Sequence, residues 1–459
     1  MIKRKLVIDL KPTQILVLGF LLLIIFGTLL LNLPFASASG SSVGFIDALF
    51  TATSAVCVTG LVVLDTFSAW TMFGKVVIIT LIQIGGIGFM TITTTLFILL
   101  GKKIGLKERL IIQEALNQYT ISGMVRLSRN IILGTFIIEG LGAIFLTFNF
   151  LPEYGSDAVF MGIFHSISAF CNAGFDIIDG SSLTPYISNV VVNITVMSLI
   201  IFGGLGFTVW LDLLQTTKER LKYKWRSITW FRKLSLHTKI VLVMTTGLIL
   251  IGAIFFFLLE YSNPGTLGDL SIKEKILGSF FQSVTTRTAG FNTIPQENMS
   301  FASQFMTIMM MFIGGSPGGT AGGVKTVTMG VIFLAVVSVV RAKDDVEVYG
   351  RRISWDIIKR ALAVVVISIT LVFLVTMSLT LTESGSFIEI LFEAVSAFAT
   401  VGLTVGATAK LTVIGKLIIS VAMFIGRLGP VTIAVAITMR SNKKAKVMVK
   451  YPEEKVMVG

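Results

Sequence analysis

Four short segments each end in a turn centred on a glycine, and their spacing suggests that they act together. They read SAVCVTGL (54–61), SAFCNAGF (168–175), VTTRTAGF (284–291) and SAFATVGL (396–403). The glycines Gly60, Gly174, Gly290 and Gly402 are separated by 114, 116 and 112 residues. A period this regular is typical of an internal fourfold repeat.

Glycine turns of this kind can bind a dehydrated cation through their backbone. Glycine permits the unusual φ values that align carbonyl oxygens, and rings of such oxygens can replace the hydration shell of a monovalent ion. The turns carry no carboxylate, which Ca²⁺ or Mg²⁺ would normally require, so we expect K⁺ and no metal site beyond the permeating ion. The predicted K⁺ filter consists of Cys57, Val58, Thr59, Gly60, Cys171, Asn172, Ala173, Gly174, Thr288, Ala289, Gly290, Ala399, Thr400, Val401 and Gly402.

A second glycine motif follows each turn at a nearly constant distance. It reads QIGGIGF (83–89), IFGGLGF (201–207), FIGGSPGG (312–319) and FIGRLGP (424–430). A single glycine of either kind could merely permit close helix packing, and that is the role we expect for Gly85, Gly86, Gly203 and Gly204. Four turns in register favour the filter interpretation for the first motif.

The third copy of the second motif is too rich in glycine and proline to continue a helix. GGSPGGTAGGVK (314–325) has six glycines, one proline and two hydroxyls in twelve residues, which predicts a broken helix just inside the filter. We interpret it as a gate. The predicted gate residues are Gly314, Gly315, Ser316, Pro317, Gly318, Gly319, Thr320, Ala321, Gly322, Gly323, Lys325 and Arg427.

Basic side chains inside apolar segments are costly and usually face a cavity or a partner. Arg427 replaces a glycine of the second motif, and we expect it to repel cations below the filter and to hold the gate through backbone carbonyls or the hydroxyls of Ser316 and Thr320. We expect Arg287 to support the filter from behind. The alternative for Arg427 is a structural salt bridge with Glu393, Asp212 or Glu139.

The elements that position these residues are predicted to be membrane helices. Hydrophobic residues form 54% and charged residues 14% of the 459, and a bilayer core of about 30 Å needs about 20 apolar residues per crossing. Eight segments qualify: 15–33, 76–100, 130–150, 188–213, 240–259, 301–340, 361–382 and 412–438. Four shorter stretches precede the glycine turns, at 43–55, 158–170, 274–285 and 387–398.

The predicted fold is therefore an all-α membrane protein with eight transmembrane helices in four helix, pore helix, helix repeats around a pseudo-fourfold pore. Irregular backbone at membrane depth is tolerated where it lines such a cavity. The predicted repeats are 1–120, 121–232, 233–352 and 353–459, the last including a cytoplasmic C-terminal tail.

Positive charge orients this arrangement. Of the 38 Lys and Arg residues, 30 fall in five patches, and the positive-inside rule assigns such patches to the cytoplasm. Both termini are then cytoplasmic and the pore helices enter from outside. The net charge of +13 does not indicate nucleic-acid binding, because membrane topology and contact with anionic lipid headgroups explain it. The patches are 1–14, 101–130, 214–239, 341–360 and 440–459.

Little in the sequence points to catalysis. Cys57 and Cys171 lack disulfide or metal spacing, the two histidines make no dyad or metal site, and no nucleophile is paired with a base, so we expect no enzyme activity. The basic N-terminus is followed by an apolar run longer than a usual signal core. We therefore expect a retained helix and no cleaved signal peptide.

These motifs together resemble the superfamily of Trk, Ktr and plant HKT transporters over nearly the whole chain. LGKKIGLKERLIIQEALNQ (100–118) and LEYSNPGTLG (259–268) are similar to bacterial Ktr membrane subunits of the KtrB or KtrD type. The turns depart from the TVGYG of tetrameric K⁺ channels, because only the glycine is common to all four. This difference in sequence affects how strongly the turns would select K⁺ over Na⁺. Glycine in all four turns favours K⁺.

The resemblance implies several properties. Ktr membrane subunits are homodimers in the bacterial plasma membrane, each protomer with its own pore, on a cytosolic RCK/KTN ring of KtrA or KtrC type. The ring would dock on basic regions such as 101–110 and 218–239, and ATP or ADP would act only through it. Na⁺ is implied as an activator, and the gate roles of 314–325 and Arg427 follow as well. We expect gated, channel-like K⁺ uptake; a Na⁺- or H⁺-coupled symporter and a non-transporting scaffold remain the alternatives.

Overall fold

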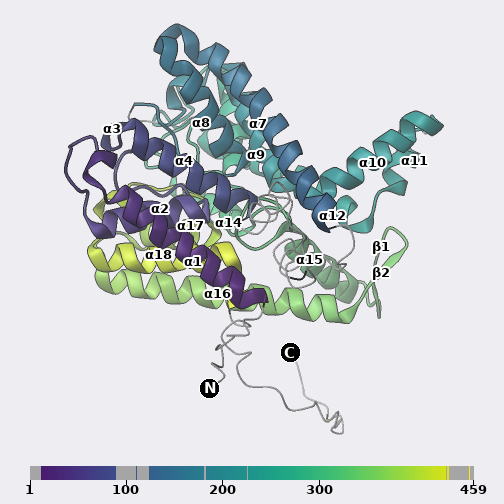
Figure 1. Cartoon of the computed structure of the whole chain (residues 1–459). Coiled ribbons are helices and arrows are strands. Elements are labelled where there is room, and N and C mark those ends of the chain that lie inside the picture. The colour runs from purple at the N-terminus through teal and green to yellow at the C-terminus, as the bar shows by residue number, and fades with distance from the viewer. Residues whose placement is uncertain are drawn as a thin grey trace, which may run out of the picture.

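The computed structural model describes residues 12–88, 110, 124–179, 182–224, 226–430, 432–433 and 454. Long apolar helices dominate it (Figure 1). Within this part of the chain, four helical stretches are long and apolar enough to cross a bilayer, and the pair α9 and α10 is a fifth if counted as one span. The four are α1 (Pro12–Leu31), α7 (Met124–Tyr154) with the adjoining α8, α12 (Leu236–Glu260) and α16 (Trp355–Thr382).

A short helix precedes each glycine turn, as the sequence predicts. These helices have 13 or 14 residues and thus a length of about 20 Å, too short to cross the hydrocarbon. Two of them begin with a capping box, Ser271 with Glu274 and Ser386 with Glu389, which satisfies the first backbone N–H groups. The helices are α2 (Phe45–Cys57), α8 (Ala158–Phe170), α13 (Ile272–Thr285) and α17 (Phe387–Ala399).

A second helix follows each turn and starts at a polar N-cap: Thr71, Asn189, Ser300 or Thr412. These helices are α4 (Met72–Ile87), α9 (Val190–Leu205), α14 (Phe301–Phe312) and α18 (Val413–Leu428). Three of the four end at a glycine with a φ near +90°, a conformation that suits glycine and stops a helix. The glycines are Gly88 (φ 93°), Gly206 (φ 93°) and Gly429 (φ 87°).

These glycines correct two predicted spans. Segment 188–213 is not one straight helix, because α10 (Phe207–Tyr223) leaves α9 at 98°. Segment 412–438 is interrupted after Leu428. Segment 301–340 is broken as predicted, with α15 (Thr326–Val340) resuming after the loop. Residues 89–100 and 434–438 of the predicted spans lie outside the described residues.

The all-α prediction missed a small β-hairpin in a basic region that the charge pattern assigns to the cytoplasm. A two-stranded antiparallel hairpin, β1 (Val346–Val348) and β2 (Arg351–Ile353), precedes α16. Helices α10 and α11 (Ser227–Lys233) form a hairpin that projects from the body on the same side as β1 and β2 (Figure 1). A short α3 (Thr66–Ala69) follows the first turn at the opposite end.

The outer surface is apolar and part of the interior is polar, in contrast to a water-soluble protein. Large apolar side chains such as Leu22 and Phe148 are 65% and 70% exposed on the outer helices, whereas polar residues such as Ser54, Thr285 and Ser396 are fully buried at the centre. Lipid tails can cover the first group, and the second must find partners within the protein. The centre of the molecule is therefore where the polar backbone of the turns has to be satisfied.

Candidate functional site: four converging glycine turns

All four turns have the same backbone conformation. The residue two positions before each glycine is left-handed, with φ values of 57° at Val58, 59° at Asn172, 64° at Thr288 and 52° at Thr400. The glycine itself is left-handed again, with φ from 68° to 91°. Alternation of left- and right-handed residues turns successive backbone groups toward the same side. The sequence predicted the four turn glycines. It did not predict that four residues with side chains would also adopt a left-handed conformation.

The four glycines meet in a closed ring. A Cβ built on each one would approach the carbonyl oxygen just before the next glycine, in the order Gly60, Gly174, Gly290, Gly402 and back to Gly60. The four distances are 2.3, 2.6, 2.6 and 2.2 Å, well below a normal contact. Only glycine fits at these positions, because both the positive φ and the close approach exclude a side chain.

The backbone oxygens around this ring have no donor in the described structure. The fifteen residues of the predicted filter are buried, yet none of their carbonyl oxygens accepts a hydrogen bond from any described residue. Buried carbonyls are nearly always paired. An unpaired set of this size is chemically suited to coordinate a cation.

Hydroxyl groups fix each turn from behind. Ser54 and Ser396 accept the N–H of Gly60 and Gly402, both at 3.1 Å. In the other two turns the hydroxyl instead donates to the carbonyl that follows the glycine: Ser168 to Phe175 and Thr285 to Phe291, both at 2.7 Å. The turns are therefore similar in backbone but supported in two different ways.

The glycine-rich segment 314–325 is a loop seated on the break between α9 and α10. The N–H groups of Ser316 and Thr320 donate to the carbonyls of Gly204 (2.8 Å) and Gly203 (3.1 Å), and the N–H of Phe207 donates to Gly318 (3.0 Å). Helix ends leave such groups without intrahelical partners. The backbone groups of the loop and those at the helix break therefore satisfy each other's hydrogen-bonding capacity. The sequence did not predict this pairing.

Arg427 lies beside this loop and holds three backbone carbonyls. Its guanidinium donates to the carbonyls of Thr320, Gly85 and Gly86. This matches the predicted tether to the loop, through a backbone oxygen. The alternative salt bridge is wrong for the described residues: none of their carboxylates lies within ion-pair distance of Arg427.

The other two basic residues that the sequence analysis singled out, Lys325 and Arg287, also lack acidic partners in the described part of the chain. The ammonium of Lys325 donates to the carbonyl of Ala321 at 2.6 Å, which folds the loop onto itself. Arg287 is 5% exposed; one of its nitrogens donates to the hydroxyl of Thr245 at 3.3 Å, and its Nε has no partner. Arg287 packs against α12, outside the ring, which agrees with a supporting position.

Gly85, Gly86 and Gly203 provide close packing, as predicted, whereas a Cβ on Gly204 would meet only ordinary contacts at 3.8 Å or more. A Cβ on Gly85 or Gly203 would lie 2.0 Å or 1.9 Å from the carbonyl oxygen of Val56 or Phe170, at the end of a short helix. Gly426 makes the same contact with Phe398 at 1.8 Å. In the first, second and fourth copies the motif therefore packs the second helix against the base of its own turn, whereas Gly314 of the third copy packs against Gly322 of the loop.

A buried carboxylate lies behind the second turn. Glu139 of α7 is 4% exposed and accepts hydrogen bonds from the Nε2 of Gln83 at 3.0 and 3.1 Å, in addition to one from the thiol of Cys171. The sulfur of Cys171 is 3.9 Å away. No described cation pairs with this carboxylate.

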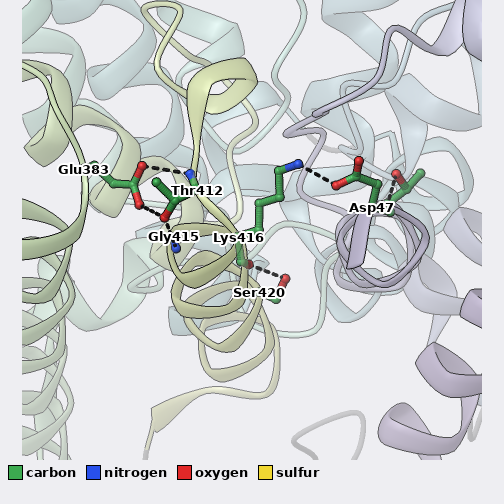
Figure 2. Close-up of polar contacts among 7 residues, drawn as sticks. Asp47, Glu383, Thr412, Gly415, Lys416 and Ser420 are labelled. Atoms are coloured by element: carbon green, nitrogen blue, oxygen red, sulfur yellow. Dashed lines mark hydrogen bonds and ion pairs between the residues drawn. The ribbon is translucent and has the colours of Figure 1, made fainter. Parts of the chain in front are cut away.

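Polar ties join neighbouring units at the outer rim. Figure 2 shows Lys416 of α18 reaching Asp47 in the first turn of α2, at 2.5 Å, and Glu383 holding the N-cap Thr412. Between the second and third units, Ser188 donates to Glu274. That hydrogen bond, with those from Ser271, holds the pKa of Glu274 below its usual range.

We expect the Lys416 and Asp47 pair to contribute about 1 kcal/mol to stability, because it is an ion pair of intermediate exposure. Lys416→Met and Asp47→Asn should each lower the midpoint of thermal unfolding in detergent, and the double variant should be no less stable than either single variant. The exposed pair Arg352 and Asp345 is the control, since Arg352→Met should leave the midpoint unchanged. Additive losses would exclude a direct interaction.

The sequence also matches a known family. The TrkH family model, described as a cation transport protein, matches residues 10–447. The chain belongs to the TrkH family. Its resemblance to Trk and Ktr proteins is thereby confirmed, and its long apolar helices are those of an integral membrane protein.

Relatives of this TrkH-family chain include the Ktr system potassium uptake protein B of Bacillus subtilis, 45% identical over 98% of this chain and 97% of the relative. The potassium/sodium uptake protein NtpJ of Enterococcus hirae is 43% identical over 98% of both chains. The crystal structure of TrkH from Vibrio parahaemolyticus shares the fold, with a TM-score of 0.69 at 18% identity, covering 92% of this chain and 84% of that one. The names describe transport and uptake, in agreement with the expectation that the chain is not an enzyme.

Proposed function

We propose that this chain is the ion-conducting subunit of a K⁺ uptake system, with gated, channel-like permeation through the four glycine turns. The observation that carries this proposal is the set of buried carbonyl oxygens at the four turns that have no hydrogen-bond donor among the described residues. Oxygens of this kind replace water around a K⁺ ion. The potassium uptake relatives support the same ion.

The proposed architecture has four helix, pore helix, helix repeats with eight spans around the ring. The common φ pattern of the turns and the cyclic contact of their glycines support it. The C-terminal ends of the short helices point their partial negative charge toward the ring, which favours a cation there. The charge patches support cytoplasmic termini.

The proposed gate is the loop 314–325 together with Arg427. The loop lies against the base of the turns, where a Cβ on Gly322 would be 2.0 Å from the hydroxyl of Thr400. Arg427 adds a positive charge without an acidic partner among the described residues. A loop that blocks the path and a charge that repels the ion would together form the closed barrier.

Assembly and control are proposed from the Ktr resemblance. The chain would form a homodimer with one pore in each protomer and would bind a cytosolic ring of RCK/KTN type, as KtrA or KtrC does for its own system. The projecting hairpin of α10 and α11, with basic residues such as Arg220 and Lys222, offers that ring a surface. ATP and ADP would act through the ring, and Na⁺ would act as an activator.

A coupled Na⁺ or H⁺ symporter is the second candidate, and Glu139 favours it. A buried carboxylate that has only neutral partners, 3.9 Å from a residue of the second turn, is a suitable place for a coupling ion. The relative NtpJ, named as a potassium/sodium uptake protein, agrees with this second candidate.

Reversal potentials separate the two candidates. Purified protein in liposomes with a K⁺ gradient should give a Nernstian K⁺ response that is independent of pH and Na⁺, and Glu139→Gln should leave that response unchanged. A reversal potential that moves with pH or Na⁺, and loses this dependence in Glu139→Gln, would replace the channel-like mechanism with coupling. No K⁺ flux at all, even with a cognate regulator, would indicate a scaffold.

A further inference from the structure

One contact joins the glycine-rich loop to the ring of turns through side chains. Asn172 and Thr320 lie 148 residues apart in sequence, and the hydroxyl of Thr320 donates to the side-chain oxygen of Asn172 at 2.8 Å. Both residues are buried. The same hydroxyl lies 3.1 Å from the carbonyl of Phe170, the last residue of α8, so its proton is shared between two acceptors of the second turn.

Asn172 is different from its counterparts in the other turns. The equivalent left-handed positions hold Val58, Thr288 and Thr400, and the structure gives no hydrogen bond to the hydroxyls of Thr288 and Thr400. The amide of Asn172 has a donor as well as an acceptor, and its nitrogen donates to the carbonyl of Arg287 at 3.3 Å. Asn172 therefore connects the loop to the second turn and also to the third.

The loop side of the contact is fixed just as firmly. The backbone of Thr320 donates to Gly203 at 3.1 Å and accepts from Arg427. A Cβ on Gly203 would lie 2.6 Å from the amide oxygen of Asn172 and 2.8 Å from the hydroxyl of Thr320. The two side chains are thus pressed together by α9, and neither can rotate away while the loop stays in place.

We propose that Asn172 couples the loop to the ring, so that displacement of the loop changes how the ring binds K⁺. This rests on the proposed function of the loop as a gate and of the ring as a filter. Moving Thr320 away leaves the amide oxygen of Asn172 buried without its donor, which is unfavourable. The Asn172 side chain then reorients, and its hold on the second and third turns changes. Asn172 is a positioning residue in this proposal, because its side chain acts through the backbone of the turns.

The coupling is tested by a double-mutant cycle with Thr320→Val and Asn172→Val. Valine has nearly the shape of threonine, and Val58 shows that a left-handed valine is accepted at the position of Asn172. The readouts are the K⁺ dissociation constant from K⁺ titration of purified protein and the ⁸⁶Rb⁺ flux of the same protein in liposomes without a regulator. We expect Thr320→Val to shift both quantities about five- to tenfold, the effect of one buried hydrogen bond. Asn172→Val also loses the hydrogen bond to Arg287, so its shift should be at least as large, and the double variant should match Asn172→Val.

Two further variants make the result specific. Thr320→Ser keeps the hydroxyl and should restore wild-type values. Thr307→Val removes a buried hydroxyl that bonds only within α14 and should change neither readout. Additive effects in the double variant, or a Thr320→Val protein that binds K⁺ as Thr307→Val does, would overturn the coupling. If the wild-type protein itself neither binds nor conducts K⁺, the proposed function fails instead.

Discussion

Replacing Gly290 with serine should reduce the preference for K⁺ over Na⁺ by about tenfold or more. A Cβ at this position would lie 2.6 Å from the carbonyl oxygen of Val401, and the φ of +80° is unfavourable for any residue with a side chain. The strain alone is about 1–2 kcal/mol, and a carbonyl displaced from the ring is a lost ligand. The measurement is ⁸⁶Rb⁺ flux into liposomes, with Na⁺ and Li⁺ as competitors.

The matched control is Gly406→Ser. Gly406 has a φ of +92° in the loop after the fourth turn, but nothing lies within 4 Å of its Cβ position. It carries the same backbone strain without the contact to a ring oxygen, so its selectivity should equal that of the wild type. An unchanged K⁺ to Na⁺ ratio in Gly290→Ser, or an equal change in both variants, would remove Gly290 from the filter.

Replacing Arg427 with glutamine should raise K⁺ flux in the absence of a regulator by about a hundredfold. The guanidinium holds the loop at Thr320 and has no carboxylate partner among the described residues. A unit charge about 6 Å from an ion costs about 3 kcal/mol at an effective dielectric constant of about 20. Glutamine keeps a hydrogen-bond donor but loses the charge. The measurement is ⁸⁶Rb⁺ flux of the purified protein in liposomes.

Arg427→Lys separates charge from tethering. Lysine keeps the positive charge but cannot hold the carbonyls of Thr320, Gly85 and Gly86 with a planar fork. If charge forms the barrier, the lysine variant should stay close to wild-type flux. Equal opening by lysine and glutamine would show that tethering dominates, and no opening by either would exclude Arg427 from the gate.

Much of the local structure could be predicted because it depends on composition over short stretches. The short helices end three to five residues before the turn glycines, and the interruption of 301–340 follows directly from six glycines and a proline in twelve residues. The period of about 114 residues indicated which turns correspond. Packing at Gly85 and Gly203 followed from the same repeat.

The breaks at Gly206 and Gly429 were missed for a physical reason. Glycine accepts both helical and left-handed backbone, so its presence does not reveal which one it adopts. At Gly206 the loop stabilises the left-handed conformation, because the N–H groups of Ser316 and Thr320 donate to carbonyls at the end of α9. That pairing joins segments more than one hundred residues apart.

The sequence by itself indicated a membrane protein, predicted four similar units, and located the short helices before the turn glycines and the one interrupted helix. These features depend on residue types and their spacing along the chain. Only the tertiary structure decided that the four glycines close into a ring, that Val58, Asn172, Thr288 and Thr400 are left-handed, and that Arg427 binds carbonyls. Such features depend on contacts between distant segments, because backbone groups buried together must satisfy one another or remain free for an ion.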